Sequence, residues 1–212
     1  MHTFTDFVKE YKLLLPENFL SKIQEFCELL LEANKNTNLV SKNDEQKLLT
    51  RHVADSLIFA AYLNNEKYSQ LNWADIGSGA GFPVIPLSLY FPHIKFFAVE
   101  CRKKRSEFLN FAKQKLNLRN LEVIHGSAGT HGNDSLQNMD FVSCRAVGSL
   151  EEDWERAKKI LKKGGIFLTV KSKRIIDEMP PVKGMKIWNY RLPGEKMEYA
   201  LAHIKNIHSQ GT

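Results

Sequence analysis

The fold of this chain is decided by the stretch from Trp73 to Pro83, which reads WADIGSGAGFP. Its apolar first half predicts a buried strand, and the glycines that follow predict a tight turn leading into a helix. Glycine lacks Cβ, so the backbone can turn sharply and come close to a ligand. The helix that follows directs unpaired N–H groups toward the same place. The stretch therefore predicts a ligand cradle. The alternative is a plain strand-to-helix turn that binds nothing.

The spacing of the glycines favours one kind of ligand. Dinucleotide-binding loops have G-x-G-x-x-G spacing, whereas here Gly81 comes one residue earlier and is followed closely by Pro83. Proline is tolerated in the first helical turn. A tight loop with no emphasis on a diphosphate suits a nucleoside with a short zwitterionic tail, and S-adenosylmethionine fits that description. We expect its contacts to include Asp75, Gly77, Ser78, Gly79 and Gly81, with Asp75 shaping the loop or reaching the amino acid end through water.

A second strand, predicted over 94–100, ends in Glu100. Glu100 follows Gly77 by 23 positions (100 − 77), close to the spacing at which an acidic side chain reaches a ribose. Because a carboxylate can accept hydrogen bonds from both ribose hydroxyls, we assign Glu100 to the adenosine ribose. A solvated acid at a strand end is the simpler alternative. Arg102 leaves open a reader of a ribose 2′-phosphate, as in an NADP-dependent oxidoreductase.

Composition and charge exclude several classes of protein. The chain has 212 residues, 43% of them hydrophobic, and a formal net charge of +6, which favours a polyanionic partner such as RNA. The three cysteines show no disulfide framework or zinc spacing. The sequence has no run of about 18 apolar residues, the length that a membrane span requires. The N-terminus does not resemble a signal peptide. We therefore expect a cytoplasmic protein, monomeric and without a metal or a membrane span.

Periodicity divides the chain into two parts. Residues 1–66 have helical patterns, among them one over Leu48 to Ala61, and predict an N-terminal helical cap. Residues 67–212 alternate strand and helix and predict the core, one compact unit with the cap. Expected strands are 72–76, 94–100, 120–125, 139–145, 165–171, 184–191 and 197–206, and expected helices are 83–90, 102–116 and about 150–162. A short connection at Leu192–Glu195 predicts a closing hairpin with an antiparallel last strand. The prediction is an α/β, Rossmann-like class I methyltransferase fold: a mostly parallel seven-stranded sheet with helices on both faces.

The fourth predicted strand narrows the chemistry. It lacks the Asn- or Asp-Pro-Pro-aromatic segment used to methylate adenine or amide nitrogens. Cys144 is placed where a cytosine-C5 methyltransferase would carry its nucleophile, but a strand-end cysteine is more often a small buried apolar group. Guanine N7 offers a lone pair and no proton to remove, so its methylation needs positioning rather than acid–base catalysis. We therefore assign no catalytic acid, base or nucleophile.

Cationic side chains are candidates for contacts with anions. Arg145, at the end of the fourth strand, could meet a cofactor carboxylate or an RNA phosphate, or could form a structural salt bridge. Lys171, Lys173 and Arg174 follow the fifth strand at the ligand-bearing edge and are candidates for RNA phosphate. The other basic runs, including Arg102 to Arg105, are typical of solvated helix faces.

Four segments resemble one known family. They are NL at 38–39, RHVADSL at 51–57, DIGSGAGFP at 75–83 and SCRAV at 143–147. In this order they resemble the RsmG family, also called GidB, over about residues 18–206. The resemblance implies a methyltransferase that uses S-adenosylmethionine and acts on N7 of one guanine of 16S ribosomal RNA, in the small ribosomal subunit. A non-catalytic RNA-binding or assembly protein with the same fold is the other alternative.

The resemblance also implies roles for single residues. In the family, the residues matching Gly77, Phe82 and Arg145 contact the cofactor. A pair that is typically Ala-Glu also contacts it, and it aligns here with Ala128-Gly129, so the glutamate is replaced. Glu100 stands where the family often has aspartate, which keeps the carboxylate. Arg51, His52 and Asp55 either pack the cap over the pocket or face the RNA, with helix capping or an interhelical salt bridge as the structural alternative. We name Arg51 and His52 as RNA-binding candidates.

Overall fold

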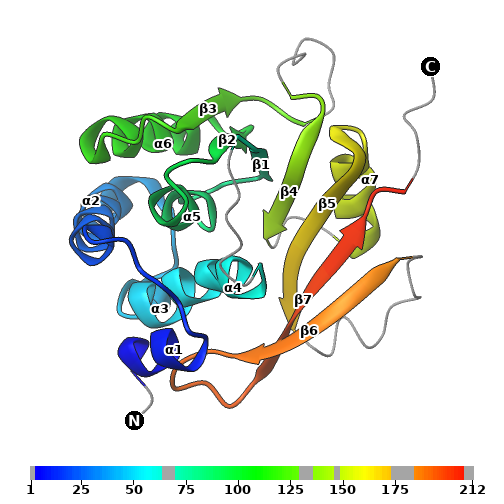
Figure 1. The fold of residues 1–212 in the computed structure, drawn as a ribbon. Helices are drawn as coiled ribbons and strands as arrows, with labels where there is room; N and C mark the ends of the chain where they lie inside the picture. Colours follow the sequence, from blue (N-terminus) through cyan, green and yellow to red (C-terminus); the bar gives the residue numbers. More distant parts are fainter. Residues whose placement is uncertain (1–2, 64–69, 129–135, 146–148, 173–183, 208–212) are drawn as a thin grey trace.

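The computed structural model describes residues 3–63, 70–128, 136–145, 149–172 and 184–207. Within these residues one seven-stranded sheet has the order β3-β2-β1-β4-β5-β7-β6 (Figure 1). The strands are β1 (Asn72–Ile76), β2 (Lys95–Glu100), β3 (Leu121–His125), β4 (Met139–Arg145), β5 (Leu161–Ser172), β6 (Met185–Arg191) and β7 (Glu198–Lys205). Strands β2 and β3 are added on one side of β1, and β4 and the later strands on its other side, so the strand order reverses between β1 and β4.

The first five strands are parallel to one another, and β7 is antiparallel to both of its neighbours. This agrees with the predicted hairpin. Strands β1 and β2 are buried along almost their whole length, as expected of parallel strands covered on both faces. The sequence prediction of the fold class is therefore confirmed.

One element boundary was predicted wrongly. The helix expected to reach residue 162 ends at Lys158, and β5 begins at Leu161 rather than at 165. Leu161 is fully buried and pairs with Met139, and the register shifts before the next pair, Phe141 with Ile166. An irregular extension of a strand onto its neighbour leaves no clear periodicity in the sequence.

Helices cover both faces of the sheet (Figure 1). One side carries α1 (Phe4–Glu10), α2 (Phe19–Thr37), α3 (Lys42–Glu45), the π-helix η1 (Leu48–Val53), α4 (Ala54–Tyr62), α5 (Val84–Tyr90) and α6 (Lys103–Leu116). The opposite side carries α7 (Leu150–Lys158). In the part of the chain that the structure describes, no helix has the length and apolarity that crossing a membrane requires.

The cap and the sheet share one hydrophobic core. The indole of Trp73 lies at its centre, with ring centroids 6.3 Å from Phe59 of α4, 5.5 Å from Phe96 of β2 and 5.0 Å from Phe141 of β4. All four side chains are buried. Because aromatic side chains contribute large apolar areas, this cluster fixes the cap helices on the strands that carry the glycine loop.

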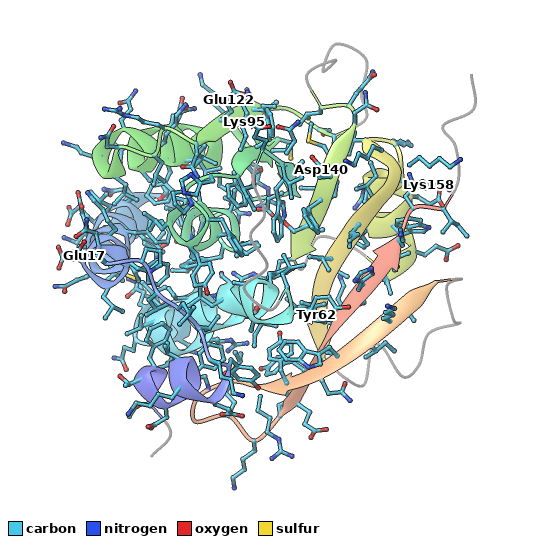
Figure 2. All side chains as sticks on the ribbon, viewed as in Figure 1. Glu17, Tyr62, Lys95, Glu122, Asp140 and Lys158 are labelled. Carbon is cyan, nitrogen blue, oxygen red and sulfur yellow. The ribbon has the colours of Figure 1, made fainter. Side chains whose placement is uncertain are left out.

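Polar contacts add to this packing. Tyr62, labelled in Figure 2, lies at the end of α4, and its hydroxyl is 2.9 Å from Nδ1 of His203 on β7. Asp140 accepts a hydrogen bond of 2.8 Å from the backbone N–H of Asn72 and pairs with Lys162, which links β1, β4 and β5. The Asp140 contacts thus join the amino ends of the three strands, and the Tyr62 contact ties the cap to β7.

Candidate active site

A cavity of about 440 Å³ lies at the carboxyl ends of β1, β2 and β4. This is the edge at which open α/β sheets bind ligands, next to the point where the strand order reverses, and the volume is within the usual range of ligand sites. The cavity is lined by Leu39, Val40, Ser41, Asp44, His52, Gly77, Ser78, Gly79, Ala80, Phe82, Glu100, Cys101, Arg102, Arg105 and Arg145. Most predicted cofactor residues thus line the same cavity, together with residues of the cap.

The glycine loop is held to β2 by its backbone. The N–H groups of Gly77 and Ser78 both donate to the carbonyl of Val99, at 2.8 and 3.1 Å. Gly77 and Gly79 have φ of +73° and +55°, a region that other residues avoid. A Cβ on Gly79 would find its nearest atom, of Arg105, only at 3.6 Å, so glycine here leaves the backbone open to a ligand.

Gly81 has a packing role. It does not line the cavity, and a Cβ there would lie 2.6 Å from Cδ1 of Ile85 and 3.2 Å from Cζ of Phe26. Its φ of +96° is also unfavourable for any other residue. The third glycine therefore allows the loop to pack against α2 and α5, and its predicted contact with the cofactor stays a prediction.

Asp75 lies behind the loop and is 1% exposed. Its Oδ1 accepts a hydrogen bond of 2.7 Å from the Ser143 hydroxyl, whereas Oδ2 has no partner. Burial raises the pKa of Asp75 to about 7. Ser78 donates through its hydroxyl to the carbonyl of Asp75 at 2.9 Å and so shapes the turn. An unpaired buried acceptor at this place fits a cationic donor group on the ligand, reached through water.

Glu100 lines the cavity and is 3% exposed. Its carboxylate accepts backbone N–H groups from Gly79 at 2.9 Å and from Arg102 at 2.7 Å, one on each oxygen. Each carboxylate oxygen retains a further lone pair. Glu100 therefore fixes the loop and can still accept hydrogen bonds from a ribose.

Arg145 joins the sheet to the cap. Its Nη1 donates to Oδ2 of Asp55 at 3.1 Å, and its Nη2 donates to Nδ1 of His52 at 3.1 Å. The guanidinium lies 5.4 Å from the ring centroid of Phe82. Tyr190 of β6 donates its hydroxyl to the other oxygen of Asp55, and burial raises the pKa of Tyr190 well above its ordinary value. Arg145 thus both forms the structural ion pair considered above and lines the cavity.

His52 is oriented from two sides. Its ring stacks on Phe82 with centroids 5.1 Å apart, and Nδ1 accepts from Arg145, so the ring proton is on Nε2. Burial, and secondly the charge of Arg145, lowers the pKa of His52 to about 4. Nε2 has no hydrogen-bond partner, because Oδ1 of Asp44 is 3.6 Å away. His52 is therefore a neutral donor on the wall of the cavity.

The remaining predicted residues either lie away from the cavity or fall outside the described residues. Lys171 was predicted to face RNA, but its side chain is 7% exposed and pairs at 3.0 Å with the buried Asp153, so this prediction is wrong. Ala128 is half-buried, packs against the α7 side of the core and does not line the cavity. Gly129, Lys173 and Arg174 lie outside the described residues. Cys144 is buried and burial raises the pKa of its thiol, which argues against a role as a thiolate nucleophile.

The cap wall of the cavity is a part of the site that the sequence patterns do not predict. Leu39, Val40, Ser41 and Asp44 line it, and Ser41 with Asp44 forms the N-terminal cap of α3. The segment NL at 38–39 was the available signal. Arg105 was also missed, because a basic run at a helix start was interpreted as a solvated face. Among the described residues, no group of His, Cys, Asp or Glu side chains could hold a metal ion.

Comparison with known proteins identifies the family. The family model for rRNA small subunit methyltransferase G, GidB, matches residues 19–186. The chain belongs to this family. It is 32% identical to ribosomal RNA small subunit methyltransferase G of Staphylococcus carnosus, over 93% of this chain and 87% of that protein. It is 31% identical to the protein of the same name from Listeria monocytogenes, over 87% and 81% of the two chains. The resemblance stated from the motifs is confirmed.

A solved structure supports the fold independently. A methyltransferase from Aquifex aeolicus, described as SAM dependent, superposes with a TM-score of 0.53 at 17% identity, covering 78% of this chain and all of that one. At this identity the likeness shows the fold alone. It confirms the class I methyltransferase architecture of this GidB-family chain.

Proposed function

We propose that this GidB-family chain transfers the methyl group of S-adenosylmethionine to N7 of a guanine in 16S ribosomal RNA. The observation that carries the proposal is the cavity at the carboxyl edge of the sheet, where the glycine loop, Glu100 and Arg145 meet. The name of the family and of its two relatives supplies the class of substrate. The atom N7 rests on the motif resemblance and on the chemistry below.

The residues present fit S-adenosylmethionine. Gly77 and Gly79 allow close approach of the backbone, and Glu100 has lone pairs for the ribose hydroxyls. Arg145 lines the cavity and can meet the carboxylate of the zwitterionic tail. Asp75 lies behind the loop, outside the cavity lining, so its carboxyl group can reach the ammonium group only through water. When bound, the cofactor supplies an electrophilic methyl group on a sulfonium. Phe82 lines the same cavity and supports Arg145.

Methyl transfer to N7 requires little of the protein beyond orientation. N7 carries an in-plane lone pair and no proton, so no general base is needed. The buried Cys144 thiol is in keeping with this, because a cytosine-C5 reaction would need a reactive thiolate. The cavity wall must hold the base in line with the methyl group and keep water out. His52, Asp44 and Phe82 are the side chains available for that wall.

The RNA backbone needs cations at the mouth of the cavity. Arg102 and Arg105 line it, and Lys103 and Lys104 are exposed beside them at the start of α6. Arg51 is 42% exposed and bridges Asp44 at 3.3 Å and Glu195 at 3.8 Å. We assign phosphate contacts to these side chains. The predicted contacts of Lys173 and Arg174 stay predictions.

The two alternatives have little support. An NADP-dependent enzyme would place a 2′-phosphate beside Arg102, but the buried carboxylate of Glu100 stands at the ribose position and would repel it. The family is also one of methyltransferases. A non-catalytic RNA-binding protein would not need a cofactor-sized cavity whose wall includes His52.

One experiment tests both the reaction and the atom. The protein is incubated with methyl-labelled S-adenosylmethionine and small ribosomal subunits from cells that lack this methyltransferase, and the RNA is then treated with borohydride and aniline, which cleave at N7-methylguanine. We expect label in 16S RNA and one new cleavage site. Label without cleavage would move the reaction to another atom. No label, with cofactor binding verified separately, would favour the non-catalytic alternative.

A further inference from the structure

The cap wall of the cavity carries polar groups that the cofactor does not account for. The nucleoside and tail of the cofactor are matched by Glu100, Asp75 and Arg145, all of which lie on the sheet side. Ser41, Asp44 and His52 line the same cavity from α3 and η1. Ser41 and Asp44 bond to each other and Asp44 also pairs with Arg51, but their remaining lone pairs and the N–H of His52 are available to a second ligand in the cavity.

His52 presents one fixed hydrogen-bond donor. Phe82 and Arg145 hold the ring in place, and the acceptor nitrogen Nδ1 is already used. The side chain is 14% exposed, and Nε2 itself is buried with no acceptor at full hydrogen-bond distance, since Oδ1 of Asp44 lies 3.6 Å away. A ligand acceptor that enters between His52 and Asp44 would satisfy this N–H.

Asp44 presents acceptors directly beside that donor. Its Oδ1 lies 3.6 Å from Nε2 of His52 and 3.3 Å from Nη1 of Arg51, and its Oδ2 accepts the Ser41 hydroxyl at 2.6 Å. The hydrogen bond from Ser41 lowers the pKa of Asp44, so the carboxylate is ionised. Its side chain is 22% exposed, and each oxygen has a second lone pair for a ligand.

We propose that His52 and Asp44 recognise the Watson–Crick edge of the target guanine, His52 donating to O6 and Asp44 accepting from N1–H and the 2-amino group. This inference rests on the proposed guanine chemistry. Enzymes that modify a base take it out of the stack and contact that edge in a pocket. N7 lies on the major-groove edge of the base, on the other side of O6 from N1. Hydrogen bonds to the Watson–Crick edge therefore leave N7 free to face the methyl group.

The same pattern rejects adenine. Adenine has an amino donor where guanine has O6, and an unprotonated N1 where guanine has N1–H. Its amino group would meet the N–H of His52, and its N1 would meet the carboxylate of Asp44. Both contacts place like groups together, and a site built for hydrogen bonds discriminates strongly against a ligand that leaves them unpaired.

The test compares variants that differ in one hydrogen-bonding group. His52→Asn keeps an acceptor for Arg145 but removes the Nε2 donor, whereas His52→Gln keeps a donor at the Nε2 position. Asp44→Asn replaces one of the two acceptor oxygens by a donor. For each we measure kcat/KM with small subunits that lack the methyl group, and the Kd of S-adenosylmethionine by calorimetry. The same subunits are also reconstituted with inosine, which lacks the 2-amino group, at the methylated position.

We expect His52→Asn and Asp44→Asn to lower kcat/KM about 10- to 100-fold, the usual effect of losing a hydrogen bond to a charged or buried group. Their Kd for the cofactor should stay within about twofold of wild type, and His52→Gln should retain most of the activity. Inosine should lower kcat/KM about 10-fold for the wild type but have little further effect on Asp44→Asn, because the two changes remove the same contact.

The outcomes separate this inference from the proposed function. A wild-type protein that fails to methylate guanine subunits would refute the function itself. Methylation by the wild type with unchanged kcat/KM in both variants would refute only the roles of His52 and Asp44. A cofactor Kd weakened as much as kcat/KM would show that these residues hold the cofactor instead. If His52→Asn does not fold, the inosine comparison with Asp44→Asn decides alone.

Discussion

Residues of one short motif serve different purposes in this protein. Gly79 leaves open space on the cavity side of the loop, whereas Gly81 has Ile85 and Phe26 where a Cβ would be. Asp75, at the end of β1, directs one carboxylate oxygen to Ser143 and leaves the other unpaired. The motif thus combines a residue of the cavity wall, a packing contact and a buried titratable group within seven positions, 75 to 81.

Asp75 should make the stability of the ligand-free protein depend on pH. An unfolded aspartate has a pKa of about 3.9, and burial raises the folded value to about 7. Between these values the folded state holds the extra proton, so the free energy of unfolding falls as pH rises. From pH 5 to pH 8 the loss amounts to about 3 kcal/mol. Asp75→Asn removes the titrating group and should remove this decline.

Urea denaturation of both proteins at pH 5 and pH 8, without cofactor, measures the effect. The stability of Asp75→Asn relative to wild type should be higher at pH 8 than at pH 5. An identical difference at the two pH values would show that the Asp75 carboxyl titrates normally. Cofactor affinity, measured at pH 8, should fall in the variant because the acceptor for the ammonium group loses its charge.

Among the elements, η1 and the start of α6 do most to shape the site. The sequence predicts an ordinary helix from Leu48, but residues 48–53 form a π-helix. Such turns are often found at functional sites. In this one, the neighbouring side chains of Arg51 and His52 both lie near Asp44. The start of α6 carries Arg102 to Arg105 and no acidic residue in its first turn, although cations there oppose the helix dipole.

The lysines in the first turn of α6, which are unfavourable for the helix dipole, should contact RNA phosphate. Replacing Lys103 and Lys104 by glutamine should weaken binding to small subunits and reduce the slope of log K against log salt by about 1 to 2. Thermal stability should stay equal or rise, since the change relieves the repulsion from the helix dipole. Filter binding over a salt series measures both affinity and slope.

Lys113 and Lys115 at the other end of α6 provide the matched control. The double glutamine variant there has the same charge change and should bind like wild type. Equal losses in the two variants would mean that only net charge matters and that the start of α6 has no special contact.

At the scale of the whole molecule, the cap and the strands form one packed unit. Phe26 of α2 is fully buried, and its ring centroid lies 5.2 Å from that of Phe82 and 6.5 Å from that of Phe108. The residues of 1–66 and of 67–212 thus meet in one core cluster. We infer that they unfold together, in line with the single compact unit predicted from the sequence.

Truncation of Phe26 should test this unity. Phe26→Ala should lower the free energy of unfolding by about 3 to 5 kcal/mol, the usual cost of removing a buried aromatic ring. It should also weaken cofactor binding, because Phe82 loses its support. Denaturation followed by far-UV circular dichroism and by tryptophan fluorescence should give coincident curves. Two separate transitions would instead indicate a cap that unfolds independently.

The sequence by itself determined the glycine loop, the order of strands and helices, the closing hairpin and the family. These depend on local periodicity and on spacing within short segments, which a sequence displays directly. Only the tertiary structure decided which polar side chains meet. His52 and Arg145 are separated by 93 positions and Asp55 and Tyr190 by 135, and no local pattern encodes such pairs. The burial of Lys171 and the raised pKa of Asp75 were also decided there, because a side chain's solvation depends on everything packed around it.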